Sequence, residues 1–177
     1  MASGDHLDRE GLMKKLEELS ISTTTVDHPE AFTMEDMIKH VGHVPGILAK
    51  NLFMYGKKKK DLWLLSARND ADVKLTDLSK QVGAPGGLRF AADSILEETL
   101  GVRAGCVTAF ALINDKEKKV KFLLDKELLN EEKGPINFHP LTNAATTAIS
   151  ASDLKKFLET TGHEPILVEF ESASPSS

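Results

Sequence analysis

The sequence lacks the features of disulfide-bonded, membrane-spanning and secreted proteins. It has one cysteine among 177 residues, so it cannot form an internal disulfide, and a reducing compartment is expected. No apolar run approaches the ~20 residues that a membrane-spanning helix needs. Residues 1–8 show no basic stretch followed by an apolar one, so we expect no secretory signal. These absences predict a cytoplasmic protein without a membrane partner.

An excess of positive charge is also absent. The chain carries 22 Lys and Arg against 27 Asp and Glu, a formal net charge of -5. Proteins that coat nucleic acids nonspecifically depend on many Lys and Arg contacts to phosphate, so we expect no DNA partner. The negative net charge does not exclude an enzyme that binds only the end of an RNA, because such an enzyme needs only a local basic patch around its binding site. The lysines at 57–60 could contact an RNA backbone, although a solvated hairpin turn is the simpler interpretation.

Motifs of several common site classes are missing as well. Residues 83–87, Gly-Ala-Pro-Gly-Gly, match neither a P-loop nor a dinucleotide fingerprint, and there is no Gly-x-Ser-x-Gly elbow. His28, His40 and His43 lack a Cys or carboxylate partner at a known metal-site spacing. We therefore predict no metal and no cofactor. Cys106 is not paired with a base by any motif, which favours a small packed residue over a thiol nucleophile.

Helical and strand patterns are mixed along the rest of the chain, with no repeat and no linker, so one α+β domain with a mixed sheet is expected. Apolar spacing and capping residues predict helices at residues 7–19, 33–41, 75–82, 93–100 and 150–158. β-Branched and alternating segments predict strands at 20–26, 50–55, 62–67, 107–113, 120–124, 136–139, 146–149 and 166–170. Two hairpins are expected, one joining 50–55 to 62–67 and one joining 107–113 to 120–124.

Three short segments carry most of the functional information. They are Lys-Asn-Leu-Phe at 50–53, Gly-Cys-Val-Thr-Ala at 105–109, and Phe-His-Pro-Leu-Thr-Asn at 138–143. This set resembles the prolyl-tRNA synthetase-associated (YbaK/ProX-type) editing domain, most closely its free-standing members. The resemblance spans about residues 28–170 and implies a mixed sheet or partly closed barrel surrounded by helices. Residues 1–27 would add a helix and the first strand to the same domain, and 171–177 would be a frayed tail.

The resemblance implies two catalytic residues, Lys50 and His139, and a substrate-binding residue, Asn51, next to Lys50. Lys50 is the residue it ties most closely to deacylation, and a compact ammonium suits a phosphate or an ester carbonyl gaining negative charge. Asn51 belongs to the same signature in the free-standing members and would bind substrate. His139 would lie near the aminoacyl group, either as a general base or as a hydrogen-bonding group that positions it. We favour the positioning role.

The loop that starts at Gly105 would shape the amino-acid pocket. Glycine lets the backbone approach a ligand closely. The family pattern is Gly-x-x-x-Pro, and this chain has Ala109 where the proline is expected. The change frees a φ angle and restores an N–H, which leaves the rigidity and size of the pocket open. Cys106 in the same loop and Asn143 in the third segment are the other expected substrate-binding residues, although a turn would also use an Asn there.

The implied function is a trans-acting deacylase that hydrolyses mischarged alanyl-tRNA(Pro) and so proofreads for prolyl-tRNA synthetase. A synthetase pocket that fits proline cannot strongly reject alanine, because a missing methylene changes binding by only ~1–3 kcal/mol. The implied mechanism is metal-free, and the terminal ribose hydroxyl of the tRNA helps to activate water. The expected partner is the acceptor end of a mischarged tRNA, and a transient association with the synthetase stays open.

Two alternatives also stay open. The chain could be a non-catalytic accessory or RNA-end-binding module, which the loss of the loop proline at Ala109 favours and the presence of Lys50, Asn51 and His139 opposes. It could also be a deacylase for another small amino acid, such as cysteine or serine, because a sequence does not measure pocket volume. Deacylation assays on mischarged tRNAs separate these readings.

Overall fold

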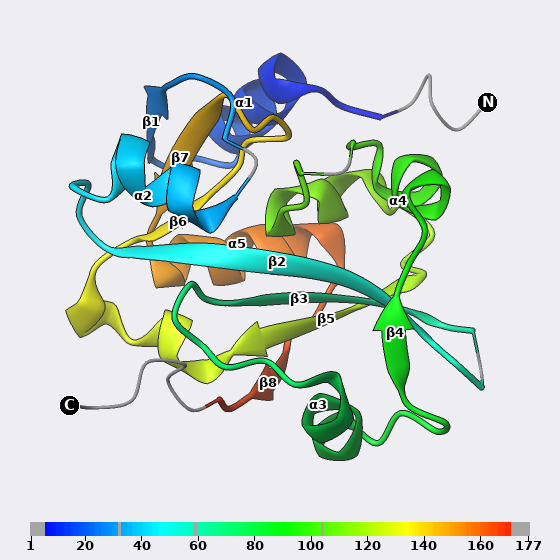
Figure 1. Cartoon of the computed structure of the whole chain (residues 1–177). Helices are drawn as coiled ribbons and strands as arrows, with labels where there is room; N and C mark the ends of the chain where they lie inside the picture. The colour runs from blue at the N-terminus through cyan, green and yellow to red at the C-terminus, as the bar shows by residue number, and fades with distance from the viewer. Residues whose placement is uncertain (1–5, 32, 59, 104, 171–177) are drawn as a thin grey trace, which may run out of the picture.

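The computed structural model describes residues 6–31, 33–58, 60–103 and 105–170 of the chain. In this part, eight strands form one mixed sheet in the order β1-β7-β6-β2-β3-β5-β8, and β4 pairs with β2 off this path (Figure 1). The predicted α+β fold with a mixed sheet is therefore confirmed. The strands are β1 Thr23–Asp27, β2 Ile47–Gly56, β3 Leu62–Arg68, β4 Leu88–Phe90, β5 Val120–Asp125, β6 Ile136–Phe138, β7 Ala145–Ile149 and β8 Ile166–Val168. The tail at 171–177, expected to be frayed, lies outside the described residues.

The sheet contains both antiparallel and parallel pairs. β2 pairs antiparallel with β3 and with β4, and β7 pairs antiparallel with β1 and β6. β6 pairs parallel with β2, while β5 lies parallel between β3 and β8. The predicted hairpin between β2 and β3 is confirmed, with Tyr55 opposite Leu62 next to the lysine-rich turn.

Capping residues mark the start of α2 and of α5. Thr33 accepts a hydrogen bond from the Asp36 N–H at 3.1 Å, and Ser150 accepts one from the Asp153 N–H at 3.1 Å. Gly162 ends the last helix in the left-handed conformation, as expected, and the helix extends to Thr161 rather than to residue 158. The helices are α1 Arg9–Glu18, α2 Met34–Val41, α3 Leu75–Val82, α4 Asp93–Leu100 and α5 Ala151–Thr161, with 3₁₀ turns at Ala109–Asn114 (η2), Lys126–Leu129 (η3) and Glu131–Lys133 (η4).

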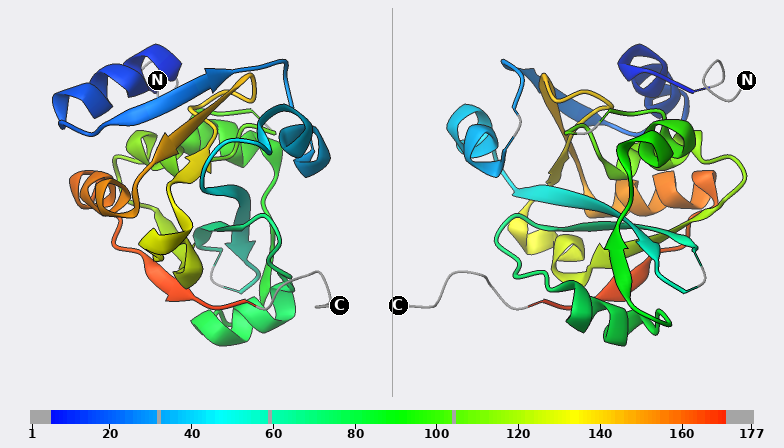
Figure 2. Two further views of the ribbon diagram at one scale, coloured as in Figure 1. Left: turned by 90° about the vertical axis from the view of Figure 1, so that its left-hand side faces the viewer. Right: turned by 45° about the vertical axis from the view of Figure 1, so that its right-hand side comes forward.

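The two faces of the sheet bury separate cores. On one face, Phe53 of β2 packs in a large cluster with residues of α1, α4, α5 and η2. On the other, Met54 packs in a smaller cluster with Leu78 of α3. Alternate side chains of a strand point to opposite faces, so β2 contributes to both. Figure 2 shows α1 and α3 at opposite ends of the molecule.

The second predicted hairpin is wrong. Residues 107–113 were expected to form a strand, but Ala109–Asn114 is a 3₁₀ helix and β5 pairs with β3 and β8 instead. Thr108 caps this turn by accepting a hydrogen bond from the Phe110 N–H at 3.3 Å. Phe110 packs edge-on against Phe138 and Phe157. A short apolar segment that is buried on all sides has no period, so the pattern could not separate strand from helix.

Candidate active site

A pocket opens where β2 changes its partner along one edge. Ile47 and Leu48 pair with β6, and residues 54–56 pair with β4. Between them, residues 49–53 have no strand partner on that edge in the described part of the chain. The pocket there has a volume of about 190 Å³ and brings together four of the predicted site residues, which are Lys50, Asn51, Gly105 and His139.

Lys50 stands at the edge of this pocket, but its ammonium is engaged elsewhere. Its Nζ donates a hydrogen bond to the Ala71 carbonyl at 2.5 Å. Burial lowers the pKa of the ammonium, and the nearby carboxylates of Asp72 and Asp70 offset part of that effect. Lys50 lies opposite Ala67 in the β2–β3 register, on the face of the sheet that packs against α3.

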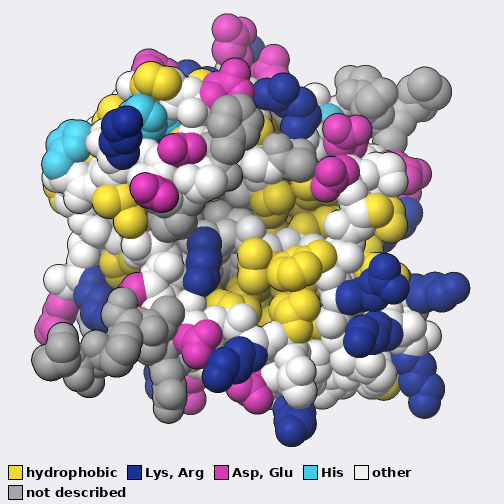
Figure 3. All heavy atoms as spheres, in the orientation of Figure 1, with side chains coloured by type: hydrophobic (Ala, Val, Ile, Leu, Met, Phe, Trp, Pro, Cys, Tyr) yellow, Lys and Arg dark blue, Asp and Glu magenta, His cyan; other side chains and the backbone are white. Residues whose placement is uncertain are grey.

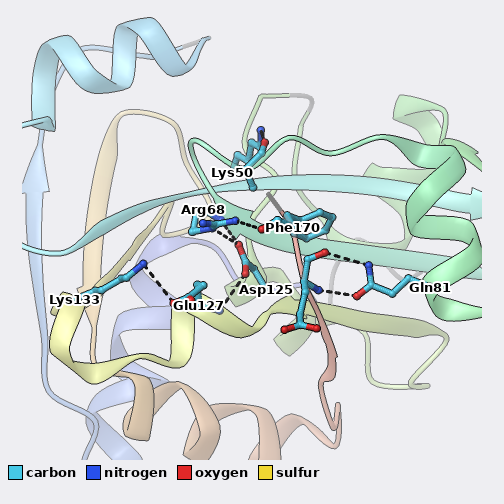
Figure 4. Close-up of polar contacts among 9 residues, drawn as sticks. Lys50, Arg68, Gln81, Asp125, Glu127, Lys133 and Phe170 are labelled. Atoms are coloured by element: carbon cyan, nitrogen blue, oxygen red, sulfur yellow. Dashed lines mark hydrogen bonds and ion pairs between the residues drawn. The ribbon is translucent and has the colours of Figure 1, made fainter. Parts of the chain in front are cut away.

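The loop that carries Ala71 starts from an ion pair at the end of β3. Arg68 donates from its Nε to Asp125 Oδ2 at 2.9 Å and from its guanidinium to the Phe170 carbonyl at 2.6 Å (Figure 4). The Asp125 carboxylate is fully buried and Arg68 is mostly buried. Truncating one partner of such a pair leaves a buried charge uncompensated. The pair therefore fixes the start of the loop whose carbonyl holds the Lys50 ammonium.

Asn51 faces the other side of the sheet and is oriented by a neighbouring strand. The hydroxyl of Ser66, which is fully buried on β3, donates to Asn51 Oδ1. Among the described residues, no acceptor contacts the Asn51 NH₂ group. The carboxamide is thus held with its oxygen toward β3, and its NH₂ group is available to a ligand in the pocket.

His139 follows β6 and is largely shielded from solvent. Burial lowers the pKa of its imidazole, and the nearby His28 lowers it further, although a contact from Nδ1 to the Ala145 carbonyl opposes the shift. That contact is long, at 3.5 Å. A neutral ring that donates from Nδ1 keeps Nε2 as an acceptor. His139 is therefore suited to accept a hydrogen bond or a proton at neutral pH.

The loop from Gly105 contributes backbone and small side chains to the pocket wall. Gly105 has φ +87°, a conformation that residues with a Cβ rarely adopt. Cys106 and Ala109 are buried behind the wall, with 2% and 0% exposure, and neither lines the pocket. Burial raises the pKa of the Cys106 thiol. These two positions can therefore influence the shape of the pocket but do not contact its interior.

Asn143 is also buried behind the wall. Its Nδ2 donates to the Ala31 carbonyl at 3.1 Å, and the Ala31 N–H donates to the Asn143 carbonyl at 3.0 Å. Asn143 Oδ1 is buried without a hydrogen-bond partner among the described residues. Because Ala31 lines the pocket, Asn143 holds a segment of the wall.

The sequence did not single out the other residues that line the pocket. Met37 of α2 and Val107 contribute apolar surface. Met37 lacks a motif or a charge that would mark it, whereas Val107 lies in the 105–109 segment but was not expected to contact substrate. Thr33 was expected only as a helix cap, which it is. The lining residues outside the three singled-out segments are Ala31, Thr33, Met37 and Ala49.

Histidines near the pocket are engaged with one another and with the backbone. The rings of His28 and His40 stack at 5.6 Å between centroids, and His28 contacts the Pro29 carbonyl and Thr146 Oγ1, each at 2.8 Å. In the described part of the chain, no group of three or more His, Cys, Asp or Glu residues is arranged to hold a metal ion.

No helix of the described residues is long and apolar enough to cross a membrane.

Comparison with known proteins gives consistent similarities. The family model described as aminoacyl-tRNA editing domain matches residues 28–157. Prolyl-tRNA synthetase associated domain-containing protein 1 of Bos taurus is 43% identical over 164 residues, which cover 92% of this chain and 95% of that protein. Prolyl-tRNA editing protein ProX of Acetoanaerobium sticklandii is 30% identical over 155 residues, covering 88% and 93%. The solved structure of a candidate trans-editing enzyme for prolyl tRNA synthetase has a TM-score of 0.69 at 20% identity, covering 93% and 96%.

Proposed function

The chain belongs to the aminoacyl-tRNA editing domain family, and from this premise we propose that it is a trans-acting deacylase that hydrolyses alanyl-tRNA(Pro). The observation that carries the proposal is the pocket of about 190 Å³ in which Lys50, Asn51, Gly105 and His139 meet. These residues come from three segments that are far apart in the sequence. A small pocket that combines polar groups with the apolar side chains of Met37 and Val107 suits a small amino acid esterified to a larger molecule.

In this proposal the alanyl group enters the pocket and its methyl packs against Met37 and Val107. The Asn51 NH₂ group, which Ser66 orients, donates to the ester carbonyl. Neutral His139 accepts from the ammonium or amine of the alanyl group, or from the attacking water. These contacts place the reacting atoms, and positioning alone can account for a large part of a rate enhancement on an activated ester.

The hydrolysis needs one water molecule. Its oxygen attacks the ester carbonyl carbon, and the carbonyl oxygen gains negative charge in the tetrahedral intermediate. The bond to the ribose oxygen then breaks, that oxygen takes up a proton, and free alanine and deacylated tRNA leave. The family resemblance implies that the adjacent ribose hydroxyl helps to activate the water, so no nucleophilic side chain is needed.

Lys50 acts in this proposal by exchanging partners. Its ammonium bonds to the Ala71 carbonyl, and the flexible four-carbon stem lets it turn toward a phosphate or the developing oxyanion at the pocket edge. A charged donor strengthens as negative charge develops, so it stabilises the transition state more than the ground state. The lowered pKa of Lys50 shows that its present site disfavours the charge, which makes a substrate anion a favourable alternative partner.

The same pocket explains how proline would be spared. The prolyl ring adds carbon atoms that alanine lacks, and the side chains of Met37 and Val107 line the volume that they would enter. Rejection by steric clash can exceed the ~1–3 kcal/mol that limits discrimination by a missing methylene. The volume also accommodates serine or cysteine, each one heavy atom larger than alanine, so a deacylase for those residues is the second candidate.

A panel of mischarged tRNAs tests the proposal. Alanine, serine, cysteine and proline are each esterified to the proline tRNA, and hydrolysis is followed under single-turnover conditions. The proposal predicts fastest hydrolysis of the alanyl ester and little of the prolyl ester. Fastest hydrolysis of the seryl or cysteinyl ester would favour the second candidate. No hydrolysis of any ester would favour a non-catalytic accessory module.

A further inference from the structure

A second and larger pocket lies away from the candidate active site. It has a volume of about 820 Å³ and sits between α3, β4 and the turn after β2. Three basic residues line it, Lys57, Lys80 and Arg89, and none of its described lining residues is acidic. The chain as a whole has 27 acidic and 22 basic residues. The lining of this pocket is therefore basic, although the net charge of the chain is negative.

Glycines build the pocket and bring the hairpin turn against it. Gly86 and Gly87 have φ +75° and +92°, and the Lys57 N–H donates to the Gly87 carbonyl at 2.9 Å. A Cβ on Gly86 would lie 3.0 Å from the Cβ of Lys58, so the turn packs closely on this loop. The position of the lysines is thus set by backbone contacts, in contrast to a freely extended basic tail.

An exposed aromatic ring stands at the rim of the same pocket. Phe90, the last residue of β4, is 59% exposed, although Leu88 two residues earlier is buried. Between them, the guanidinium of Arg89 lies 4.8 Å from the centre of the Tyr55 ring. Aromatic side chains beside basic ones form the usual platform for single-stranded nucleic acid, in which bases stack and phosphates are neutralised.

The pocket shares one edge of β2 with the candidate active site. β4 pairs with residues 54–56 of β2, on the edge that is open at residues 49–53. Lys50 and Gly56 lie about 20 Å apart along this strand. Figure 3 shows a hollowed hydrophobic centre on this face, with Lys and Arg side chains gathered beside it over the β2–β3 hairpin and β4, and Asp and Glu side chains on its other borders.

We propose that this second pocket binds the sugar-phosphate backbone and one base of the substrate RNA, upstream of the terminal adenosine that carries the amino acid. The inference rests on the proposed function for its choice of RNA as the ligand. Lys57, Lys80 and Arg89 contact phosphates, and Phe90 stacks on a base. The acidic remainder of the surface repels RNA, which restricts its approach to this face.

The decisive experiment measures binding of uncharged proline tRNA by fluorescence anisotropy over a series of salt concentrations. The test variants are Lys57→Gln with Lys80→Gln, and Phe90→Ser. The matched control is Lys155→Gln with Lys156→Gln, which removes the same charge from exposed positions on α5, on the opposite face of the sheet. We expect the Kd to rise about tenfold in each test variant. The slope of log Kd against log salt should fall by about one unit per lysine removed, and the control should match the wild type.

A second readout separates this inference from the proposed function. The lysine and phenylalanine variants should hydrolyse alanyl-tRNA less efficiently but hydrolyse 3′-alanyl-adenosine, which is too short to reach the pocket, at the wild-type rate. RNA binding that depends on these residues in a protein without deacylase activity would retain the inference and refute the proposed function. Wild-type RNA binding by the test variants would overturn the inference, as would no RNA binding by the wild type. Loss of binding to prolyl-tRNA synthetase alone would also overturn it and identify a protein-docking surface.

Discussion

Replacing Lys50 by methionine removes the ammonium at the edge of the candidate active site and keeps a side chain of similar length. If the ammonium stabilises the developing oxyanion, its loss should cost about 2.7–4 kcal/mol, which corresponds to a rate lower by about 10²–10³-fold. The measurement is the single-turnover rate of alanyl-tRNA(Pro) hydrolysis at saturating enzyme. Saturation ensures that the rate reports on the chemical step rather than on RNA binding.

The structure predicts that this variant stays folded. The substitution removes a charge-assisted hydrogen bond to the Ala71 carbonyl, worth about 1.5–3 kcal/mol. It also removes the penalty of holding a partly buried ammonium, which is the main cause of the lowered pKa of Lys50. These effects oppose each other, so we expect a net change of about 1 kcal/mol and a Tm shift of about 2–4 °C. Thermal melts at the assay pH check that the rate loss does not come from unfolding.

The pH dependence gives an independent check on the same residue. Burial lowers the pKa of Lys50, so the charged form is present below that value and is lost as the pH rises through it. The apparent second-order rate at limiting enzyme concentration reports on the free enzyme, in which Lys50 has this lowered pKa. Corrected for spontaneous ester hydrolysis, that rate should therefore fall on the alkaline side at a pH below the usual lysine range. The residual activity of Lys50→Met should lack this fall. A methionine variant with a near wild-type rate would refute the role of Lys50.

Three further predictions concern stability, the histidine and metals. Asp115→Asn should destabilise the fold by about 1.5–3 kcal/mol in urea unfolding, because the buried carboxylate accepts from His163 Nε2 at 2.9 Å and from two backbone N–H groups. Burial alone would raise the pKa of Asp115, but these hydrogen bonds lower it, so its contribution is present above the usual Asp pKa and is lost as the pH falls through the lowered value. The variant should lack this acid dependence, and equal acid profiles would contradict the reasoning. His139→Gln should retain more activity than His139→Ala if the ring positions substrate; equal losses of 10²-fold or more would indicate a general base. EDTA should leave the hydrolysis rate unchanged, and loss of activity restored by zinc would overturn the metal-free mechanism.

Local signals with a physical mechanism predicted much of the fold. Thr33 and Ser150 were recognised as helix caps because their side chains replace missing backbone partners, and both make that hydrogen bond. The failure at residues 107–113 has a different origin, since packing of Phe110 between Phe138 and Phe157 decides the conformation. Tertiary contacts of that kind leave no periodicity in the sequence.

The candidate site was predictable only in part. Its polar residues belong to recognisable motifs, whereas the apolar residues that line the pocket have no functional group that would identify them. Lys50 and Asn51 are adjacent in sequence, yet strand alternation sends their side chains to opposite faces, and only the open edge of β2 brings both to one pocket. Met37 and Val107 line the pocket, but neither side chain carries a charge or a polar group that would mark its role. Their roles depend on how α2 and the Gly105 loop fold over β2, which no local pattern encodes.

The most direct test of the account compares alanyl-tRNA(Pro) with prolyl-tRNA(Pro) under identical single-turnover conditions, with Lys50→Met as the reference of reduced activity. The account predicts that the wild-type enzyme hydrolyses the alanyl ester much faster than the reference and leaves the prolyl ester at the rate seen without enzyme. Hydrolysis of both esters at the same rate would contradict the size-selective pocket. A wild-type rate on the alanyl ester no faster than the reference would contradict the assignment of this site as a deacylase.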